Sequence, residues 1–429
     1  MAIGYSTVSN LIVLVLGSGG REHALVRGLA ADPTVAQVHI APGNPGCEAL
    51  ATNHDIDPLD AKSVVDLARK VAASFVLIGP EVPLAVGISD ALREAGIPVF
   101  GPSKAAAQLE SSKAFAKRMM EKAGVPTASY AECKGPEDVA AALERFGAPY
   151  VVKHDGLEAG KGVLVTNDLE EAIEHATKAD EVVIEEYLEG PEVSLFFVTD
   201  GQTALPMMPA QDFKRLLNDD RGPNTGGMGA YTPLPWLDDD FVDQVQREVA
   251  DPVLAAMREA GMPFVGLLYV GLAVTKDGPK VIEFNARFGD PETQVLIATL
   301  VTPLGQLLYS AATGKLAEFG RMIFEGAAVC VVVAAEGYPV APKKGGHLDL
   351  PADTETAHVI HAGTARDPEG DIIANGGRVL TVVGLGKDVP AARNAAYDRL
   401  VQVKYPDAIW RTDIASDKKL SGAANNRPV

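Results

Sequence analysis

Cysteine is scarce in this chain of 429 residues, and its few cysteines are not grouped. The three of them, Cys47, Cys133 and Cys330, lie far apart and include no Cys-x-x-Cys pair. This spacing argues against a disulfide framework and against a zinc site made of cysteines. It is typical of the reducing cytosol, so we expect a cytoplasmic protein.

Long apolar runs are missing as well. The early run Leu11–Leu16 is far shorter than the roughly 20 residues that cross a bilayer, and no basic segment precedes it as in a signal peptide. The sequence also shows no repeat with a period of roughly 20–50 residues. With 47% hydrophobic and 22% charged residues the composition is globular. At about 100–200 residues per domain, the length predicts two to four domains.

Basic residues are fewer than acidic ones in this sequence. The 57 acidic residues outnumber the 38 basic ones, which gives a net charge of −19. Such a surface repels nucleic acids and anionic membranes, so we expect neither as a partner. A phosphate ligand would then need a local site made of glycine-rich backbone, a few lysines and metal ions.

The order of apolar segments predicts the fold class. Short strands alternate with helices over about the first 100 residues, which favours a parallel α/β sheet. Further on, the strands at 264–274 and 280–284 fit an antiparallel pair joined at Asp277-Gly278, and a new strand at Ala327 begins a tail module. We expect strands at 11–16, 38–41, 75–78, 150–153, 162–166, 181–187 and 193–198, and helices at 21–31, 61–73, 84–95, 104–123, 169–176, 241–260 and 293–316.

A glycine-rich turn, GSGGREH at 17–23, follows the first predicted strand. Glycines there let a ligand approach the backbone, and the N-terminus of the following helix favours an anion. The turn fits the dinucleotide fingerprint GxGxxG poorly, because Glu22 stands where the third glycine belongs. A plain strand-to-helix turn is the alternative.

Glu81 lies at the carboxyl end of the third predicted strand, in the run GPE at 79–81. Open α/β sheets place their ligands at that edge. A carboxylate there suits a sugar diol, because it accepts hydrogen bonds from two hydroxyl groups. The alternative is a solvated loop acid.

The run VVKHDGLEAGKGV at 151–163 places three glycines and two lysines in a turn between short strands. Flexible backbone N–H groups can fold over phosphate oxygens while lysine supplies point charge. The turn is not a Walker P-loop, because GxxxxGK[ST] followed by a helix is absent. A structural hairpin with two chance lysines is the alternative.

Two other segments carry weaker signals. The strand in VVIEEYLEGPE at 182–192 could offer backbone groups to an adenine edge and a carboxylate to a ribose, although taken alone it fits an ordinary amphipathic strand better. The glycine-rich run NTGGMGA at 224–230 indicates only that the backbone passes close to another group.

The densest polar cluster is the run VIEFNARFGDPET at 281–293. On a strand, Glu283 and Asn285 point to the same face, and their oxygens suit Mg²⁺, a hard cation. Arg287 can hold phosphate oxygens, and Asp290 with Glu292 can hold an ammonium group. So many polar groups between apolar neighbours are costly to bury without a function.

Four large side chains outside these motifs are not expected to take part in binding or catalysis. No third ligand accompanies His358 and His361, so we expect them at the surface rather than on a metal. Trp236 and Trp410 are expected to be packing residues.

Together the motifs resemble a known family. Three segments, in this order, resemble the ATP-grasp superfamily: the turn at 151–163 with its flanking strands (the phosphate hairpin), the VIEEYL strand, and the strand that carries Glu283 and Asn285 (the E-x-N strand). The resemblance narrows to the glycinamide ribonucleotide synthetase (phosphoribosylamine–glycine ligase) family, and it runs from about residue 11 to Ile414. The segments that carry it are GSGGREHAL, APGNPG, GPEVPL, FGPS, LESSKAFAK, DGLEAGKGV, PNTGGMGAY and IEFNARFGDPETQ.

The resemblance implies an α/β and α+β multidomain fold. A Rossmann-like N-terminal domain would span 1–110, and an ATP-grasp region with a lid at about 126–198 would span 111–325. A small C-terminal α+β domain would span 326–429. The implied activity joins glycine to 5-phosphoribosylamine with ATP and Mg²⁺ or Mn²⁺, through glycyl phosphate, in a monomer or weak homo-oligomer. Another purine-pathway ATP-grasp ligase and a non-catalytic nucleotide-binding protein are the alternatives, and the spacing after Gly17 disfavours an NAD-dependent dehydrogenase.

The resemblance also implies roles for individual residues. ATP would contact Lys113, Lys153, Gly156, Gly160, Lys161, Gly162, Glu185, Glu186, Leu188 and Glu192, and Mg²⁺ would be held by Glu283 and Asn285. Substrates would contact Gly17, Gly19, Gly20, Arg21, Glu22, Glu81, Gly227, Gly289 and Glu292, and catalysis would depend on Lys153, Arg287 and Asp290.

The sequence departs from the family pattern at a few positions. His154 and Glu158 replace small residues in the phosphate loop, and Phe213 stands where many members carry histidine. The stretch Tyr269–Leu272 offers no further metal acid.

Overall fold

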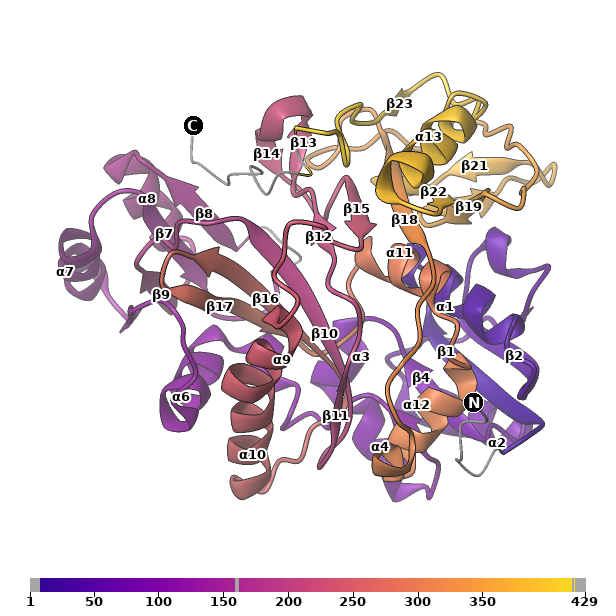
Figure 1. Ribbon diagram of the computed structural model, residues 1–429, viewed down its shortest axis with the longest axis horizontal. Coiled ribbons are helices and arrows are strands. Elements are labelled where there is room, and N and C mark those ends of the chain that lie inside the picture. Colours follow the sequence, from indigo (N-terminus) through magenta and orange to yellow (C-terminus); the bar gives the residue numbers. More distant parts are fainter. Residues whose placement is uncertain (1–7, 159–161, 419, 421–429) are drawn as a thin grey trace.

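The computed structural model describes residues 8–158, 162–418 and 420 (Figure 1). The N-terminal sheet is parallel throughout, in the order β3-β2-β1-β4-β5. The strands β2 and β4 flank β1 on opposite sides, so the strand order reverses at β1. Such sheets bind ligands at the carboxyl end of the strands, beside the point where the order reverses. The strands are β1 Leu11–Gly17, β2 Val35–Pro42, β3 Thr52–Asn53, β4 Phe75–Ile78 and β5 Val99–Phe100, and the helices are α1 Gly20–Ala30, α2 Ala61–Lys70, α3 Glu81–Val86 and α4 Ile88–Glu94, with the 3₁₀ turn η1 Pro45–Cys47.

The central region holds two antiparallel sheets. One has the order β11-β10-β16-β17. Its hairpin β16–β17 is confirmed, and because Thr275 pairs with Gly278 the two turn residues are Lys276 and Asp277, one position earlier than expected. The other, at the left of Figure 1, has the order β6-β9-β7-β8 and a small apolar core of its own. The elements of the first are β10 Glu192–Asp200, β11 Ala204–Pro206, β16 Val265–Thr275 and β17 Gly278–Asn285; those of the second are β6 Tyr130–Cys133, β7 Tyr150–His154, β8 Val163–Thr166, β9 Val182–Glu185, α7 Pro136–Phe146 and α8 Leu169–Ala176.

A fourth sheet joins the C-terminal segment to the central region. Its order is β12-β15-β18-β22-β19, and every residue of β18 is buried. Two strands that precede residue 326 therefore extend the C-terminal sheet, which crosses the expected boundary between 325 and 326. The expected domain limits stay predictions. The elements are β12 Gln211–Asp212, β15 Gly229–Thr232, β18 Ala327–Ala335, β19 Ala357–His361, β22 Arg378–Gly386, β23 Ala408–Ile409 on the far end of β18, and the covering helix α13 Val389–Leu400.

Three expected helices are divided in two. The run 84–95 breaks at Gly87, which ends α3 in the left-handed conformation with φ +97°. The run 104–123 breaks at Ser112, which is extended and caps the next helix with its hydroxyl oxygen. The run 293–316 breaks before Pro303, because a residue that precedes proline avoids the helical conformation. The helices are α5 Gln108–Ser111, α6 Lys113–Ala123, α11 Glu292–Thr299 and α12 Leu304–Ala312.

The remaining elements are short or irregular. The expected helix at 241–260 is α9 Phe241–Val245 and α10 Asp251–Glu259 with a π-helical turn between them, just before Pro252. Two small hairpins complete the fold: β13 Arg215–Leu217 with β14 Arg221–Asn224, and β20 Thr364–Arg366 with β21 Ile372–Ala374.

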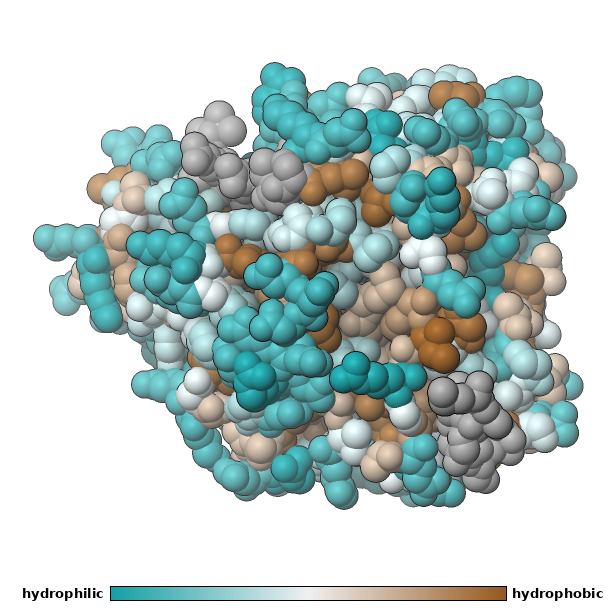
Figure 2. Space-filling view, in the orientation of Figure 1, coloured by the Kyte–Doolittle hydropathy of each residue, from teal (hydrophilic) through white to brown (hydrophobic). Residues whose placement is uncertain are grey.

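The face of the molecule seen in Figure 2 is mostly hydrophilic, and apolar residues gather there only in small patches. Across residues 8–158, 162–418 and 420, no helix combines the length and the apolar character that crossing a membrane needs. Trp236 packs against the main core, as expected, but Trp410 is 39% exposed, so the packing role predicted for it is wrong.

Histidines join the N-terminal helix α1 to the C-terminal strand β19. The backbone N–H of His361 donates to Nδ1 of His23 at 2.8 Å. Both His23 and His358 are buried, so the surface position expected for His358 is wrong. Burial, aided by Arg27 and neighbouring histidines, lowers the pKa of His23 to about 3, and burial lowers the pKa of His358 and His361 to about 4.

These histidines predict that acid weakens the fold. Each titrates near 6.5 when unfolded and lower when folded, so below that pH the unfolded chain binds more protons. The free energy of unfolding should fall by up to ~1.4 kcal/mol per pH unit for each histidine. Urea denaturation between pH 7.5 and pH 5.5 measures the fall. The variant His23→Asn keeps an acceptor for His361 but cannot take up the proton, so it should show a shallower fall; a fall equal to that of the parent would contradict this.

Candidate active site

A cavity of about 470 Å³ lies between the two central sheets and the carboxyl edge of the N-terminal sheet. It receives side chains from all three parts of the chain. The predicted residues that line it are Arg21, Glu81, Lys113, Lys153, Gly156, Gly162, Glu185, Glu186, Leu188, Glu192, Glu283, Asn285, Arg287, Asp290 and Glu292. Gly17, Gly19, Gly20, Glu22, Gly227 and Gly289 lie outside its lining, and Gly160 and Lys161 lie outside the described residues.

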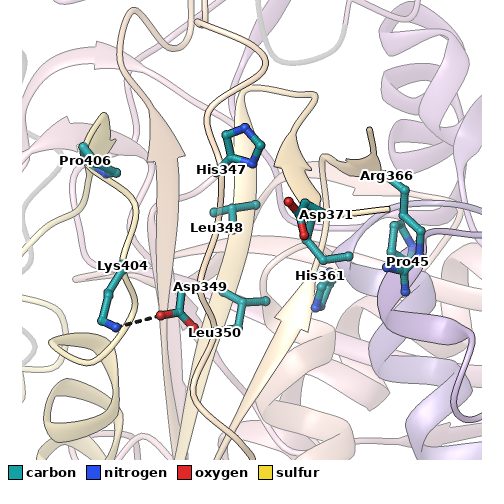
Figure 3. A pocket seen from close by; sticks show the side chains of 11 residues that line it. Pro45, His347, Leu348, Asp349, Leu350, His361, Arg366, Asp371, Lys404 and Pro406 are labelled. Carbon is teal, nitrogen blue, oxygen red and sulfur yellow. Dashed lines mark hydrogen bonds and ion pairs between the residues drawn. The ribbon is translucent and has the colours of Figure 1, made fainter. Parts of the chain in front are cut away.

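A second cavity, of about 740 Å³, lies on the C-terminal sheet (Figure 3) and is lined by none of the predicted residues. Its cations are already paired: Lys404 contacts Asp349 at 2.7 Å and Arg366 contacts Glu48 at 2.6 Å. Because none of the predicted site residues lines the larger cavity, the smaller one is the candidate active site.

Lysines gather at one end of the active-site cavity. The ammonium groups of Lys153 and Lys117 both contact the carboxylate of Glu185, at 3.0 and 3.2 Å. Lys113 Nζ donates to the carbonyl of Gly156 at 2.9 Å. Burial and the nearby Lys153 lower the pKa of Lys117 to about 8, although Glu185 opposes this. In an acidic protein, this concentration of cations makes a local anion site.

Asp155 ties the phosphate hairpin to helix α6. Its carboxylate accepts from the backbone N–H of Lys113 at 2.5 Å and from the hydroxyl of Ser112 at 3.0 Å. The break in the expected helix at Ser112 thus provides the anchor for the hairpin. Gly156 follows with φ +130°, a conformation that favours glycine.

Glu283 and Asn285 share one face of β17, as the alternation of a strand predicts. Asn285 Nδ2 donates to Glu283 Oε1 at 3.3 Å. Burial raises the pKa of Glu283, but Lys153 and Lys214 outweigh it and bring the pKa below its usual value. An ionised carboxylate beside an amide oxygen in a cavity is a donor set that fits Mg²⁺.

Arg287 lies between two carboxylates. Its guanidinium contacts Glu81 at 3.3 Å and Glu110 at 3.0 Å, and Glu110 also accepts from the backbone N–H of Ala286 at 2.7 Å. Burial raises the pKa of Glu110 despite Arg287, whereas Arg287 and Arg21 outweigh burial at Glu81 and lower its pKa. These carboxylates hold Arg287 in place and keep it charged.

The glycine-rich turn after β1 is closed by its own glutamate. Glu22 accepts from the backbone N–H of Gly19 at 2.6 Å and from Arg21 Nε at 2.5 Å. A Cβ on Gly17 would lie 2.6 Å from the Glu22 side chain, and one on Gly79 would lie 2.1 Å from it. These two glycines therefore leave space for Glu22, and Arg21 is the residue of the turn that reaches the cavity.

Comparisons with known proteins agree with this geometry. Models of the phosphoribosylglycinamide synthetase N domain, ATP-grasp (A) domain and C domain match residues 11–110, 111–293 and 328–417. The phosphoribosylamine–glycine ligase of Streptomyces coelicolor is 55% identical over 418 residues, which are 96% of this chain and 100% of that protein. The chain belongs to the phosphoribosylglycinamide synthetase family.

Similarity to the family extends to distant members and to structure. The ligase of Caulobacter vibrioides is 46% identical over 422 residues, covering 95% of this chain and 98% of that protein. The crystal structure of the Thermotoga maritima ligase has a TM-score of 0.81 at 34% identity, over 94% of this chain and 100% of that one. A biotin carboxylase domain from Hydrogenobacter thermophilus, with MgADP, ADP and bicarbonate, shares only the fold, at 18% identity, a TM-score of 0.71, and coverage of 96% of this chain and 95% of that one. The expected family and the three-part ATP-grasp architecture are confirmed.

Several polar side chains of the synthetase cavity were not predicted, among them Ser194, Tyr269, Asp212 and Lys214. Glu292 Oε1 accepts from the hydroxyls of Tyr269 and Ser194, at 2.9 and 3.1 Å. Lys214 Nζ contacts Glu192 at 2.9 Å and Asp212 at 2.8 Å. In the run QDFKR at 211–215, side chains alternate between the two faces of an extended segment. This alternation could have predicted Asp212 and Lys214 in the cavity, because both lie on the face opposite to buried Phe213.

Two of the three positions that depart from the synthetase family pattern, Phe213 and His154, have structural explanations. Phe213 is buried in the core, 6.1 Å from the ring of Tyr231. His154 stacks on His175 at 4.1 Å, and its Nε2 lies 2.9 Å from the carbonyl of His175. This stack supports the phosphate hairpin from behind, since His154 is absent from the cavity lining. Glu158 lines the cavity.

Proposed function

We propose that this chain joins glycine to 5-phosphoribosylamine with ATP, giving glycinamide ribonucleotide, ADP and phosphate, the second step of de novo purine biosynthesis. One observation carries the proposal. A single cavity holds a lysine cluster, an oxygen pair on β17 and a half-buried arginine in a chain 55% identical to a phosphoribosylamine–glycine ligase.

The chemistry has two steps. A carboxylate oxygen of glycine attacks the γ-phosphorus of ATP; the bond from this phosphorus to the β–γ bridging oxygen breaks, and ADP leaves. The amine nitrogen of phosphoribosylamine then attacks the carbonyl carbon of glycyl phosphate, a C–N bond forms, and phosphate leaves as the amine loses a proton. No enzyme nucleophile is needed, because positioning and charge stabilisation suffice for such transfers.

ATP would occupy the lysine end of the cavity. Lys113 and Lys153 would contact its phosphates, with Gly156 and Gly162 of the hairpin, and Glu185 would position Lys153. Backbone groups of Glu186 and Leu188 would meet the adenine, and Glu192 the ribose. Glu283 and Asn285 would hold Mg²⁺, or Mn²⁺ in its place, which when bound supplies positive charge to the phosphate oxygens. The hairpin residues Gly160 and Lys161 are proposed for the same role.

Glycine and the ribosyl substrate would occupy the end near β1 and β4. Arg287 would hold the transferred phosphoryl group, and Asp290 with Glu292 would accept hydrogen bonds from amino groups. Arg21 and Glu81 would bind the phosphoribosyl group. The glycines at 17, 19, 20, 227 and 289, together with Glu22, would shape this end by letting backbone segments approach one another. We further propose that the enzyme is cytoplasmic and acts as a monomer or weak homo-oligomer.

Replacing Glu81 by alanine should weaken binding of the ribosyl substrate selectively. A hydrogen bond to a charged group contributes about 1.5–3 kcal/mol, so KM for 5-phosphoribosylamine should rise ~10- to 100-fold, while KM for ATP should change little. Steady-state kinetics measure both constants, with Glu94→Ala on the exposed side of the same domain as the control. Equal effects on the two KM values would refute the ribose role.

The proposed reaction is tested by ADP release with ATP and Mg²⁺, with and without glycine and freshly generated 5-phosphoribosylamine. Release that requires both substrates supports the ligase. Release that depends on a different acid would indicate another purine-pathway ATP-grasp ligase. No release under any combination would indicate a nucleotide-binding protein without catalysis.

A further inference from the structure

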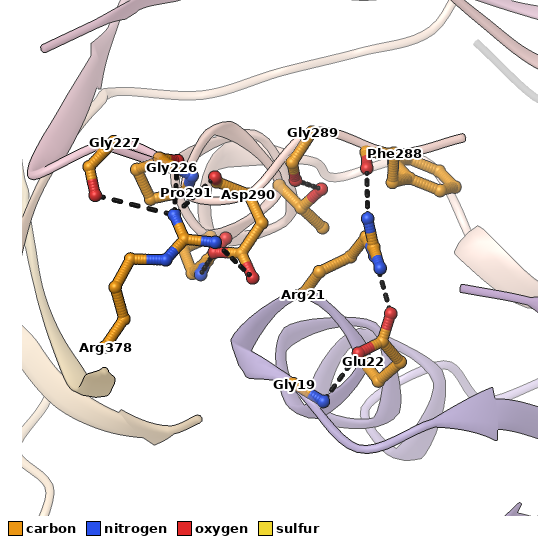
Figure 4. A network of polar contacts seen from close by, with 12 residues as sticks. Gly19, Arg21, Glu22, Gly226, Gly227, Phe288, Gly289, Asp290, Pro291 and Arg378 are labelled. Atoms are coloured by element: carbon orange, nitrogen blue, oxygen red, sulfur yellow. Dashed lines mark hydrogen bonds and ion pairs between the residues drawn. The ribbon is translucent and has the colours of Figure 1, made fainter. Parts of the chain in front are cut away.

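Arg378 brings the C-terminal sheet into the cavity. It is the first residue of β22, and its side chain lines the cavity. Figure 4 shows its guanidinium reaching two separate segments of the central region. One terminal nitrogen donates to the carbonyls of Gly226 at 2.5 Å and of Asp290 at 2.6 Å, and more weakly to that of Gly227 at 3.4 Å. The other contacts the Asp290 carboxylate at 3.3 Å.

The glycine turn is fitted to this guanidinium. A Cβ on Gly226 would lie 3.1 Å from Cζ of Arg378, and one on Gly227 would lie 2.5 Å from Pro291. Gly227 also has φ +108°, which disfavours other residues. The turn is therefore packed between Arg378 and the loop that carries Asp290.

Asp290 is held from three directions. Arg378 approaches its carboxylate from the C-terminal sheet, and Gln294 Nε2, on the following helix α11, donates to Oδ1 at 2.8 Å. The backbone N–H of Arg21, at the start of α1, stabilises its charged form. Burial would raise the pKa of Asp290, but Arg378 and Arg21 outweigh it and lower the pKa. Without Arg378, the carboxylate would lose both its main cation and the contact that fixes its backbone carbonyl.

We propose that Arg378 is a positioning residue of the ligase reaction: it fixes the Asp290 carboxylate in the orientation that receives the substrate amino group. The C-terminal sheet is then part of the catalytic machinery. This inference rests on the proposed function, because it assumes that Asp290 meets an amine. Arg378 lies 88 residues from Asp290 in the sequence, so only the fold brings the two together.

The test compares kcat and KM of Arg378→Ala, Asp290→Asn and the double variant, with Arg366→Ala as the control. Misplacement of a reacting group by about 1 Å lowers the rate on the order of 100-fold, so Arg378→Ala should lose about that in kcat, with KM for ATP nearly unchanged. The double variant should be no slower than Asp290→Asn, since Arg378 acts through Asp290. The acid limb of the kcat profile of Arg378→Ala should move to higher pH, because Asp290 has lost its cation.

The outcomes separate this inference from the proposed function. If the parent enzyme does not require both substrates, the proposed function fails. If the parent does but Arg378→Ala behaves like Arg366→Ala, or the losses of the two single variants multiply in the double variant, the positioning role is overturned. If Arg378→Ala does not fold, Arg378→Lys takes its place in the test. Lysine keeps a cation near Asp290 but loses the contacts with the carbonyls. Arg378→Lys should therefore keep the pH profile of the parent but only part of its kcat. For Arg378→Lys, an acid limb of the kcat profile moved to higher pH than in the parent, or full kcat, would overturn the proposal.

Discussion

Replacing Glu283 by glutamine should abolish turnover while leaving the fold intact. The substitution keeps the shape of the side chain and its contact with Asn285, but it removes the negative charge that faces the lysine cluster. Loss of a metal's charge stabilisation removes several kcal/mol from the transition state, so kcat should fall at least about a thousandfold. Steady-state ADP release measures the loss.

Metal binding provides a second readout for Glu283. Titration calorimetry of Mn²⁺ into the ADP-bound protein should show much weaker binding for Glu283→Gln than for the parent. Glu259→Gln, on the exposed side of α10, serves as the control and should behave as the parent. Normal activity of Glu283→Gln at saturating Mg²⁺ would exclude Glu283 as a metal ligand.

Replacing Arg287 by alanine should damage both activity and stability. Arg287 separates Glu81 from Glu110, so its removal leaves two facing carboxylates without the cation that contacts them both. Breaking a fully buried ion pair costs about 3–5 kcal/mol of stability, and the partial exposure of Arg287 and Glu81 lowers the cost expected here. The same substitution removes the proposed phosphoryl contact, so turnover should fall at least about a hundredfold. Urea denaturation and ADP release measure the two losses independently.

A second substitution separates these two effects of Arg287. The double variant Arg287→Ala with Glu110→Gln removes one unpaired charge, so it should recover part of the stability but none of the activity. Burial already raises the pKa of Glu110, and losing Arg287 should raise it further. In the single variant Arg287→Ala, the folded state should therefore hold a proton on Glu110 at a pH where the unfolded state has released it. The loss of stability caused by Arg287→Ala should then be larger at pH 8 than at pH 5.5. Equal destabilisation at both pH values would contradict this account.

Local patterns in the sequence predicted much of the site. The alternation in the E-x-N run placed Glu283 and Asn285 on one face of β17, and Asp277-Gly278 located its hairpin. Helix ends were harder to predict, because an apolar periodicity continues through Gly87 and Ser112. At those positions a single residue's backbone conformation or side-chain cap decides where the helix stops.

Local sequence patterns could not predict contacts between segments that lie far apart in the chain. Glu110 meets Ala286 across 176 residues, and Arg378 meets Asp290 across 88. Neither residue stands in a pattern that indicates its partner. The burial of His358 was missed for the same reason, since nothing near it in the sequence shows that Arg27 and helix α1 lie against β19.

The central claim is that this cavity activates the carboxylate of glycine by phosphorylation. The most direct test supplies glycine whose carboxylate carries oxygen-18, with ATP, Mg²⁺ and freshly generated 5-phosphoribosylamine, and measures the mass of the inorganic phosphate. If glycyl phosphate forms, the oxygen that bridges carbon and phosphorus leaves with the phosphoryl group, so each phosphate released should carry one heavy oxygen. Phosphate without the label, released at the same rate as the ligated product, would contradict the account.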